Sequence, residues 1–478
     1  MQSRRKFIQQ ASLLSSGLLL SQTSAWALNN HSFESKRPAL GDRKFSSAAV
    51  EATIDRLKKQ IADPELAWLF ENCFPNTLDT TVEFEIINGK PDTYVITGDI
   101  DAMWLRDSTA QVWPYLPLIK EDKPLQELVA GVINRQKKCI ILDPYANAFY
   151  KDVHKESEWK KDYTTMKPGI HERKWEIDSL CYPIRLAYHY HKTTGDTSIF
   201  DADWVRSIEL TLQTFKEQQR KDGNGPYTFQ RNTYWATDGV PLSGYGYPVK
   251  PVGLICSVFR PSDDATIYPF LIPANFFAVV SLRQAAELLN KVLNNTALAL
   301  KCTVLAMEVE KALQQHAIIN HQMYGRLYAY EVNGYGSFNL MDDANVPSLL
   351  SLPYLDAVKN TDVVYQNTRK YLLSTNNPFF FKGKAAEGIG GPHAGMNMIW
   401  PLSVTMRGLT SNNAAEVTQC LHMLKATHGG TGFMHEAFHK DDASNFTRKW
   451  FAWANTLFGE LVMHTSAKYP AILAMKEV

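Results

Sequence analysis

The spacing of its helical segments most constrains how this chain can fold. Apolar residues recur with helical periodicity in twelve segments of the 478-residue sequence, and the connections between these segments alternate between short and long. A short connection joins two helices that are antiparallel neighbours, so the alternation predicts six helical hairpins. The predicted helices span residues 48–73, 107–119, 124–141, 174–193, 198–220, 271–291, 297–317, 344–353, 359–374, 395–409, 412–427 and 447–467.

Six helical hairpins that close into a ring form an (α/α)6 barrel, a toroid with every long loop at one end. A linear solenoid is the alternative, but the sequence has no residue signature repeated at a fixed period. Strand-like alternation is limited to short pieces such as 81–87 and 324–331, which predict small β-hairpins. We therefore predict an all-α chain whose long loops meet at one end of the ring.

The N-terminus has the pattern of a twin-arginine signal peptide. Arg4 and Arg5 precede an apolar run over residues 11–20, and residues 25–27 offer small side chains for cleavage. The apolar run is too short to span a membrane comfortably. We expect the mature protein to be periplasmic and to have no membrane span.

These features divide the sequence into three parts. We expect a signal peptide over residues 1–27, a polar leader over 28–46 and a single catalytic domain over 47–478. The formal net charge is only +1, which gives no electrostatic reason to expect a nucleic-acid partner. Six cysteines are scattered without a CxxC pair, which is typical of buried thiols and leaves one disulfide possible.

Residues 97–113 contain the densest group of candidate functional side chains. Acids, an arginine and tryptophans are interleaved there, whereas a purely structural segment separates charges from large aromatics by period. An indole can stack on the C–H face of a sugar, and charged groups can bind its hydroxyls. The alternative is a helix start capped by an acid, with the tryptophans in the core. The candidates are Asp99, Asp101, Trp104, Arg106 and Asp107.

The other long loops also carry polar and aromatic motifs. In a ring of hairpins these loops converge, and loops held by a rigid scaffold are where function concentrates. An aspartate pair that caps a helix, or glycines that only make a turn, would explain each motif singly. Further candidates on these loops are Arg260, Asp263, Asp264, His393, His435 and Glu436.

A competing motif is His435-Glu436-Ala437-Phe438-His439, which fits the H-E-x-x-H pattern of zinc proteases. Zinc binding of this kind needs both histidines on one face of a sustained helix. Glycines precede the motif and a polar turn follows it, so we expect no such helix and no metal site.

The segments GDIDAMWLRDS (98–108), FRPSDDA (259–265) and GGTGFMHE (429–436) together resemble glycoside hydrolase family 125, the exo-acting α-1,6-mannosidases. The resemblance covers essentially the whole mature chain. It implies an (α/α)6 barrel, inversion at the anomeric carbon, and neither a metal nor another cofactor. It also implies Asp263 as general acid, Glu436 as general base, and α-linked mannosides or mannose-containing glycans as partners.

Chemistry agrees with this assignment. An inverting glycosidase needs two carboxyl groups roughly 6.5–9.5 Å apart, with room for a water molecule beside the base. The acid must be protonated near neutral pH, so we expect burial or a neighbouring carboxylate such as Asp264 to raise the pKa of Asp263. The sequence alone does not decide between Asp263 and Asp264 as the acid. We expect Asp99, Asp101, Trp104, Arg106, Asp107, Arg260, Asp264, His393 and His435 to bind substrate.

Two interpretations from other functional classes remain open at this point. A glycan-binding protein on the same scaffold would bind mannosides without turnover. A sugar epimerase would use histidine acid–base pairs in the same kind of ring, for which His171, His393 and His435 are candidates. The expected activity is nevertheless hydrolysis that releases mannose from the non-reducing end of α-1,6-mannosides.

Overall fold

The computed structural model describes residues 33–478, of which Ser35–Val478 form one compact unit. The predicted signal peptide therefore lies outside the described residues. Part of the predicted polar leader is packed against the helices, because Arg37 forms ion pairs with Glu51 and Asp79. A short 3-10 helix, η1 (Leu40–Asp42), also lies in this segment.

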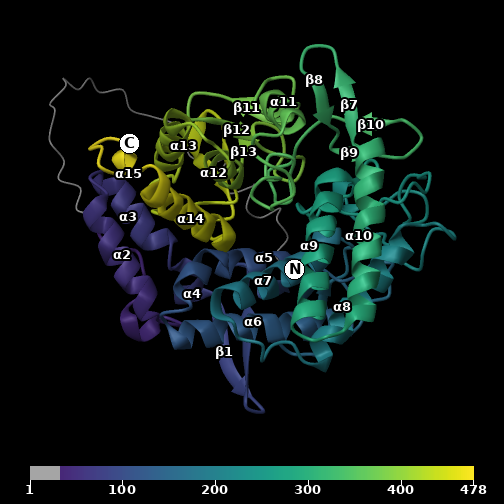
Figure 1. The fold of residues 1–478 in the computed structure, drawn as a ribbon. Helices are drawn as coiled ribbons and strands as arrows, with labels where there is room; N and C mark the ends of the chain where they lie inside the picture. The colour runs from purple at the N-terminus through teal and green to yellow at the C-terminus, as the bar shows by residue number, and fades with distance from the viewer. Residues whose placement is uncertain (1–32) are drawn as a thin grey trace. The chain divides into compact units, whose positions relative to one another are not determined.

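An inner ring of helices surrounds the centre of the unit (Figure 1). Helix α5 packs against α7 and α14, α7 packs against α9, and α12 packs against α14. These helices are α5 (Leu105–Val112), α7 (Ile177–Thr194), α9 (Ile272–Lys291), α12 (Pro401–Leu409) and α14 (Ala452–Lys468).

An outer set of helices packs against this ring. The pairs α9–α10 and α12–α13 run side by side (Figure 1), and α6 packs against both α7 and α8. The outer helices are α3 (Pro64–Cys73), α6 (Lys123–Leu142), α8 (Ala202–Gln218), α10 (Thr296–His316), α11 (Val363–Leu372) and α13 (Ala414–Ala426). Helices α2 (Ala48–Gln60), α4 (Asn76–Thr80), α15 (Pro470–Leu473) and the 3-10 helices η2 (Trp113–Leu118) and η3 (Ala236–Asp238) complete the helical elements of residues 33–478.

The inner and outer helices begin differently. All six outer helices start with an Asp or Asn whose side chain accepts a hydrogen bond from a backbone N–H of the first turn, as expected of N-caps. None of the five inner helices has such a side-chain cap. The short connections lead from inner to outer helices, so the inner helices all begin where the long loops meet. We call this end of the ring the loop end.

Short strands connect the loops at the beginnings of the inner helices. Three-stranded sheets have the orders β3-β4-β5, β10-β9-β6 and β13-β14-β15, and β1-β2, β7-β8 and β11-β12 pair as antiparallel hairpins. The strands are β1 (Val82–Ile87), β2 (Lys90–Val95), β3 (Met103–Trp104), β4 (Ala148–Phe149), β5 (Ile170–Glu172), β6 (Phe270–Leu271), β7 (Ile318–His321), β8 (Gly325–Tyr328), β9 (Glu331–Val332), β10 (Phe338–Asn339), β11 (Phe380–Lys382), β12 (Glu387–Ile389), β13 (Met398–Ile399), β14 (Ala437–His439) and β15 (Asp442–Thr447).

The predicted all-α class and ring of paired helices are confirmed, but the helix predicted over residues 344–353 is wrong. The segment forms a series of turns instead. Pro347 and Pro353 lack amide hydrogens, and the Asp342 carboxylate accepts hydrogen bonds from the backbone N–H groups of residues 349 and 350. The turns still pack against the inner ring, since Tyr182 of α7 donates to the carbonyl of Val346.

Several predicted helix boundaries also differ. The predicted helix over 48–73 is two helices, because Asp63-Pro64 starts a new one. Helix α12 starts at Pro401 rather than 395, and α14 starts at Ala452 rather than 447, because strands β13 and β15 precede them. Local periodicity does not separate these short strands from the helices that follow them.

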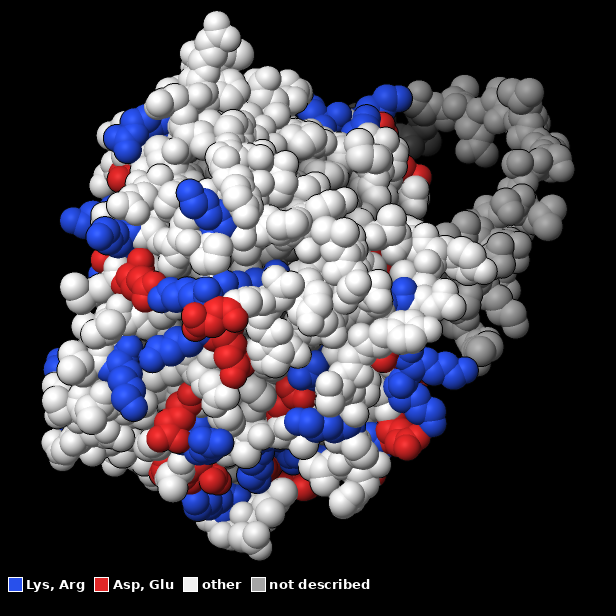
Figure 2. All heavy atoms as spheres, turned by 90° about the vertical axis from the view of Figure 1, so that its right-hand side faces the viewer, with Lys and Arg blue, Asp and Glu red and all other residues white. Residues whose placement is uncertain are grey.

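Three properties of the described residues bear on the expectations from composition. All six cysteines are buried free thiols. No helix within residues 33–478 is both long and apolar enough to cross a membrane. On the face shown in Figure 2, basic and acidic side chains are interspersed.

Asp122 connects the beginnings of two helices and provides a test of the capping pattern. Its carboxylate accepts hydrogen bonds from Leu125 N at the start of α6, and from Ser47 Oγ and Ala49 N at the start of α2. Burial would raise the pKa of Asp122, but these donors outweigh burial and lower it.

We expect Asp122→Ala to lower the free energy of unfolding by about 1–3 kcal/mol at neutral pH, measured by urea denaturation. Because the folded-state pKa is depressed, this contribution exists above the unfolded pKa of about 3.9 and is lost as pH falls through the folded pKa. Asp55→Ala, at an exposed position of α2, is the control and should change stability by less than about 0.5 kcal/mol. Equal effects of the two substitutions would contradict the capping role.

Candidate active site

Arg106 lies at the start of α5 and is almost completely buried at the loop end. Its guanidinium nitrogens lie 2.6 Å from Glu176, 3.2 Å from Asp178 and 3.2 Å from Asp263. Its Nε lies 3.5 Å from Asp107. One cation therefore faces four carboxyl groups that come from α5, from the start of α7 and from the loop before α9.

Asp263 lies on that loop in a left-handed backbone conformation, with φ of 65°. Its Oδ1 accepts hydrogen bonds from Arg106 and from Asn147 Nδ2, and Lys174 Nζ donates to its backbone carbonyl. Burial would raise the pKa of Asp263, but the positive charges of Arg106 and Lys174 outweigh burial and hold it well below its ordinary value. The Asp263 side chain is 23% exposed.

Asp264 points elsewhere, although it is the next residue. Its side chain is only 1% exposed, and its Oδ1 lies 3.3 Å from Nδ1 of His393. Burial would lower the pKa of His393, but Asp264, with smaller effects of Glu436 and Asp263, raises it to about 9. His393 is therefore a cation at neutral pH, and Asp264 is its direct partner.

Glu436 is buried on the loop before β14. It accepts a hydrogen bond of 3.0 Å from Thr447 Oγ1 and one of 3.4 Å from Arg448 Nη1. Arg448 also donates to Asp99, which links this loop to the segment before α5. The two predicted catalytic carboxyl groups thus reach the loop end from different segments.

Asp107 is the other predicted residue within this charged cluster. Burial raises its pKa to about 6, the nearby Asp263 adds to the increase, and Arg106 and Arg448 oppose it. Asp107 therefore changes protonation close to neutral pH.

The remaining predicted substrate-binding residues have other surroundings. Asp101 has a side chain that is 76% exposed and lies 3.4 Å from Lys155. Trp104 is buried edge-on against His171, at a ring distance of 5.2 Å, and its indole N–H has no hydrogen-bond partner in the described part of the chain. Arg260 is buried and paired with Glu331 at 2.7 Å.

His435 is held by the protein on both sides. It stacks on Phe446 with ring centroids 3.7 Å apart, and its nitrogens lie near Thr431 Oγ1 and two backbone carbonyls. The H-E-x-x-H motif is not on a helix, because Ala437–His439 is strand β14. Within the described chain, no group of three or more His, Cys, Asp or Glu side chains is placed to hold a metal ion.

Sequence reasoning missed several residues of the cluster. These residues are Glu176, Asp178, Lys174 and Asn147, and only their contacts with Arg106 and Asp263 identify them. Arg448 carries no sequence signal, because it follows strand β15 and is 349 residues from its partner Asp99.

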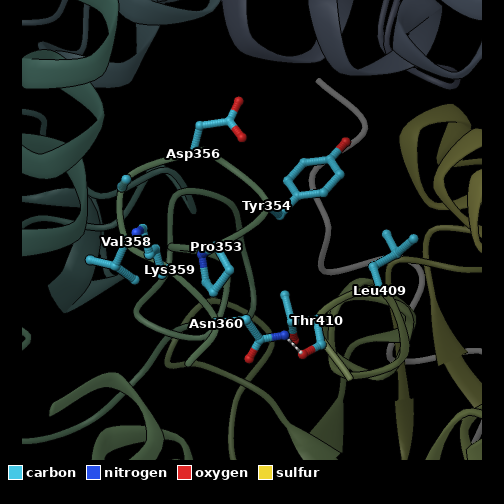
Figure 3. Close-up of a pocket in the computed structure, with 9 residues that line it drawn as sticks. Pro353, Tyr354, Asp356, Val358, Lys359, Asn360, Leu409 and Thr410 are labelled. Carbon is cyan, nitrogen blue, oxygen red and sulfur yellow. Dashed lines mark hydrogen bonds between the residues drawn. The ribbon is translucent and has the colours of Figure 1, made fainter. Parts of the chain in front are cut away.

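Figure 3 shows a separate pocket of about 540 Å³, whose lining shares no residue with this cluster. The turns after Pro353 and the end of α12 line it, with Tyr354, Asn360 and Leu409 among the lining side chains. None of the predicted site residues belongs to its lining. The charged cluster at the loop end, and not this pocket, is therefore the candidate active site.

The family model described as metal-independent alpha-mannosidase (GH125) matches residues 63–463. The chain is 43% identical over 456 residues to the meiotically up-regulated gene 157 protein of Schizosaccharomyces pombe, covering 92% of this chain and 89% of that protein.

Solved structures agree with this match. A Streptococcus pneumoniae structure, described as a non-productive substrate complex with alpha-1,6-mannobiose from a family of metal-independent alpha mannosidases, is 40% identical with a TM-score of 0.84. The similarity covers 88% of this chain and 99% of that one. A bacterial glucoamylase complexed with acarbose has a TM-score of 0.52 at 14% identity, covering 90% of this chain and 59% of that one, which is a likeness of fold alone.

The candidate catalytic carboxyl groups, the (α/α)6 barrel that presents them and a family match over most of the chain agree with one another. The chain therefore belongs to glycoside hydrolase family 125, the metal-independent α-mannosidases, and is a glycoside hydrolase.

Proposed function

We propose that this enzyme is an inverting, exo-acting mannosidase that releases mannose from the non-reducing end of α-1,6-mannosides. The observation that carries the proposal is the position of Asp263 and Glu436 on two separate loops, with both carboxyl groups close enough to His393 to raise its pKa. The Streptococcus pneumoniae relative in complex with alpha-1,6-mannobiose supports the choice of substrate.

Asp263 is the proposed general acid. Its partly exposed side chain can reach a glycosidic oxygen, whereas Asp264 is buried and paired with His393. This difference supports Asp263 over its neighbour. The left-handed backbone at Asp263 lets the adjacent side chains point to different partners.

Glu436 is the proposed general base. It must be ionised to take a proton from water, and it accepts hydrogen bonds from Thr447 and Arg448. Once the water is deprotonated, its oxygen attacks the anomeric carbon from the face opposite the leaving group. In the same displacement the glycosidic C–O bond breaks, and the acid protonates the leaving oxygen.

We further propose that the substrate-binding groups surround these carboxyl groups. Asp107, Arg106 and His393 lie within the charged cluster and offer charge-assisted hydrogen bonds to sugar hydroxyls. Asp99 is held near Glu436 through Arg448. Asp101 and His435 are less favoured for direct contact, since one is exposed and the other is held by protein groups.

A sugar epimerase is less well supported by this geometry. Its acid–base pair would need two histidines that exchange protons near neutral pH. His393 stays protonated there, and burial lowers the pKa of His171, while His435 stacks on Phe446. A glycan-binding protein without turnover would leave the paired carboxyl groups without a role.

The function can be tested by the product it forms. Proton NMR should show β-mannose as the first product from α-1,6-mannobiose, before mutarotation, because a single displacement inverts the anomeric carbon. The α-1,2- and α-1,3-linked mannobioses, as matched substrates, should react more slowly. Initial α-mannose would overturn inversion, a rearranged sugar would indicate an isomerase, and binding without any product would indicate a glycan-binding protein.

The roles of the two carboxyl groups predict different mutant behaviour. We expect Glu436→Gln to abolish hydrolysis for every leaving group while retaining substrate binding. Asp263→Asn should lower kcat/KM on mannobiose by about 10²–10⁴-fold, but much less on an aryl mannoside whose leaving group needs little protonation. Equal losses on both substrates in Asp263→Asn would contradict its role as the acid.

We also propose that residues 1–27 direct export through the twin-arginine route to the periplasm, leaving the polar leader and the catalytic domain as the mature enzyme. The support is the Arg4-Arg5 pair followed by a short apolar run. Changing both arginines to lysine keeps the charge and should leave the uncleaved precursor in the cytoplasm. A matched exchange of Arg43 for lysine and Lys44 for arginine should not affect delivery. Periplasmic delivery of the double variant Arg4→Lys, Arg5→Lys would contradict the proposal.

A further inference from the structure

The charges around Arg106 do not balance if every acid is ionised. A single guanidinium lies within 3.5 Å of Asp107, Glu176, Asp178 and Asp263. Burying several anions around one cation is costly, so such a group retains a proton. The question is which carboxyl group holds it.

The hydrogen bonds around Glu176 point to that residue. Its Oε2 accepts from Arg106 Nη1 and from Ser179 Oγ. Its Oε1 is buried and receives no donor from the described chain. Glu176 and Asp263 nevertheless face neighbouring nitrogens of the same guanidinium, Arg106 Nη1 at 2.6 Å and Nη2 at 3.2 Å. Their carboxyl groups are therefore close enough for a hydrogen bond between them. Two carboxyl groups can share such a bond only when one of them carries a proton.

The two members of this pair have different surroundings. The Glu176 side chain is completely buried, whereas that of Asp263 is 23% exposed. Burial raises the pKa of Glu176 well above its ordinary value, with the Asp263 carboxylate adding to the increase, while Arg106 and Lys174 hold that of Asp263 low. In the free site the proton therefore resides on the inner residue of the pair.

Other charged groups around the pair do not remove the need for this proton. Lys174 also faces Glu172 at 3.4 Å, and Glu172 is paired with Arg231 at 2.9 Å. His393 is a cation but is paired with Asp264.

Asp107 and Asp178 both face Arg106, and burial raises the pKa of each to about 6. Burial lowers the pKa of His171, which leaves that ring neutral.

We propose that Glu176 holds the proton that Asp263 delivers to the leaving group, which makes Glu176 a positioning residue for the acid step. This inference rests on the proposed role of Asp263 as general acid. Glu176 does not touch the substrate but acts through the carboxyl–carboxyl hydrogen bond behind Asp263.

The proton balance of the reaction closes. The Glu176 proton passes to Asp263, which protonates the glycosidic oxygen as the C–O bond breaks and its electron pair moves to that oxygen. Glu436 takes one proton from the attacking water, whose oxygen forms the new bond to the anomeric carbon. After product release, Glu436 returns its proton to solvent and Glu176 regains one through Asp263.

Glu176→Gln tests the proposal, because glutamine keeps the size and the bond to Arg106 but cannot supply a proton. We expect kcat/KM on α-1,6-mannobiose to fall about 10²-fold at pH 7, with little change on an aryl mannoside. The alkaline limb of the pH profile should move to lower pH by about one unit or more, since the remaining acid, Asp263, has a depressed pKa.

Asp178→Asn is the matched control. Like Glu176, Asp178 is a buried carboxyl group that faces Arg106, at 3.2 Å. Asp263 acts on Asp178 through its charge alone, and not through a hydrogen bond, in the described structure. Asp178→Asn should move the alkaline limb of the pH profile less than Glu176→Gln does, and its effect on kcat/KM should not depend on the leaving group. An equal shift and dependence in both variants would overturn the proposal, because general electrostatics would then explain the effect.

Two further comparisons decide the remaining outcomes. A uniform loss on both substrates in Glu176→Gln, with the alkaline limb unmoved, would show a structural role and overturn the proposal. If that variant does not fold, Glu176→Asp carries the same test, since its shorter side chain withdraws the carboxyl group from Asp263 but keeps an ionisable group. If the loss of kcat/KM depends on the leaving group in Asp263→Asn but not in Glu176→Gln, only this inference is refuted. If it does not depend on the leaving group in Asp263→Asn either, Asp263 is not the acid.

Discussion

The buried guanidinium of Arg106 is the interaction on which the loop end depends. It joins the beginning of α5 to Glu176 and Asp178 at the beginning of α7 and to Asp263 on the loop before α9. Removing this guanidinium would leave several buried carboxyl groups without their cation, which costs several kcal/mol. The three segments are therefore held in one arrangement, and the positions of the candidate catalytic groups follow from it.

The way the helices begin makes this concentration of acids tolerable. The inner helices start at the loop end without side-chain caps, so their free N–H groups and partial positive charges face the site. Asp107 and Asp178 lie in the first turns of α5 and α7, where a negative charge is favoured. The outer helices are capped by their own Asp or Asn residues and need no such partner.

Sequence reasoning could predict the ring but only part of the site. Connection lengths and helical periodicity identified the paired helices, because both are local properties of the chain. The turns at 344–353 were missed because their apolar spacing imitates a helix, while Asp342 and two prolines fix another backbone. Arg448 and Glu176 were missed because their roles depend on partners that are distant in sequence, Asp99 and Asp263. Asp263 and Glu436 could be chosen because they stand in motifs that resemble a family.

An acid that an arginine keeps ionised is on its own a poor proton donor. At Asp263, however, the contacts that keep the carboxyl group ionised are the same contacts that position it. Arg106 and Lys174 favour the Asp263 anion, and the resulting negative charge is what keeps the neighbouring Glu176 protonated. In such a coupled pair the proton belongs to both groups, and its loss is described by a pKa of the pair. A low pKa at the exposed member is therefore compatible with acid catalysis as long as the buried member can return the proton. This property arises only when residues from three loops meet, so no single sequence motif contains it.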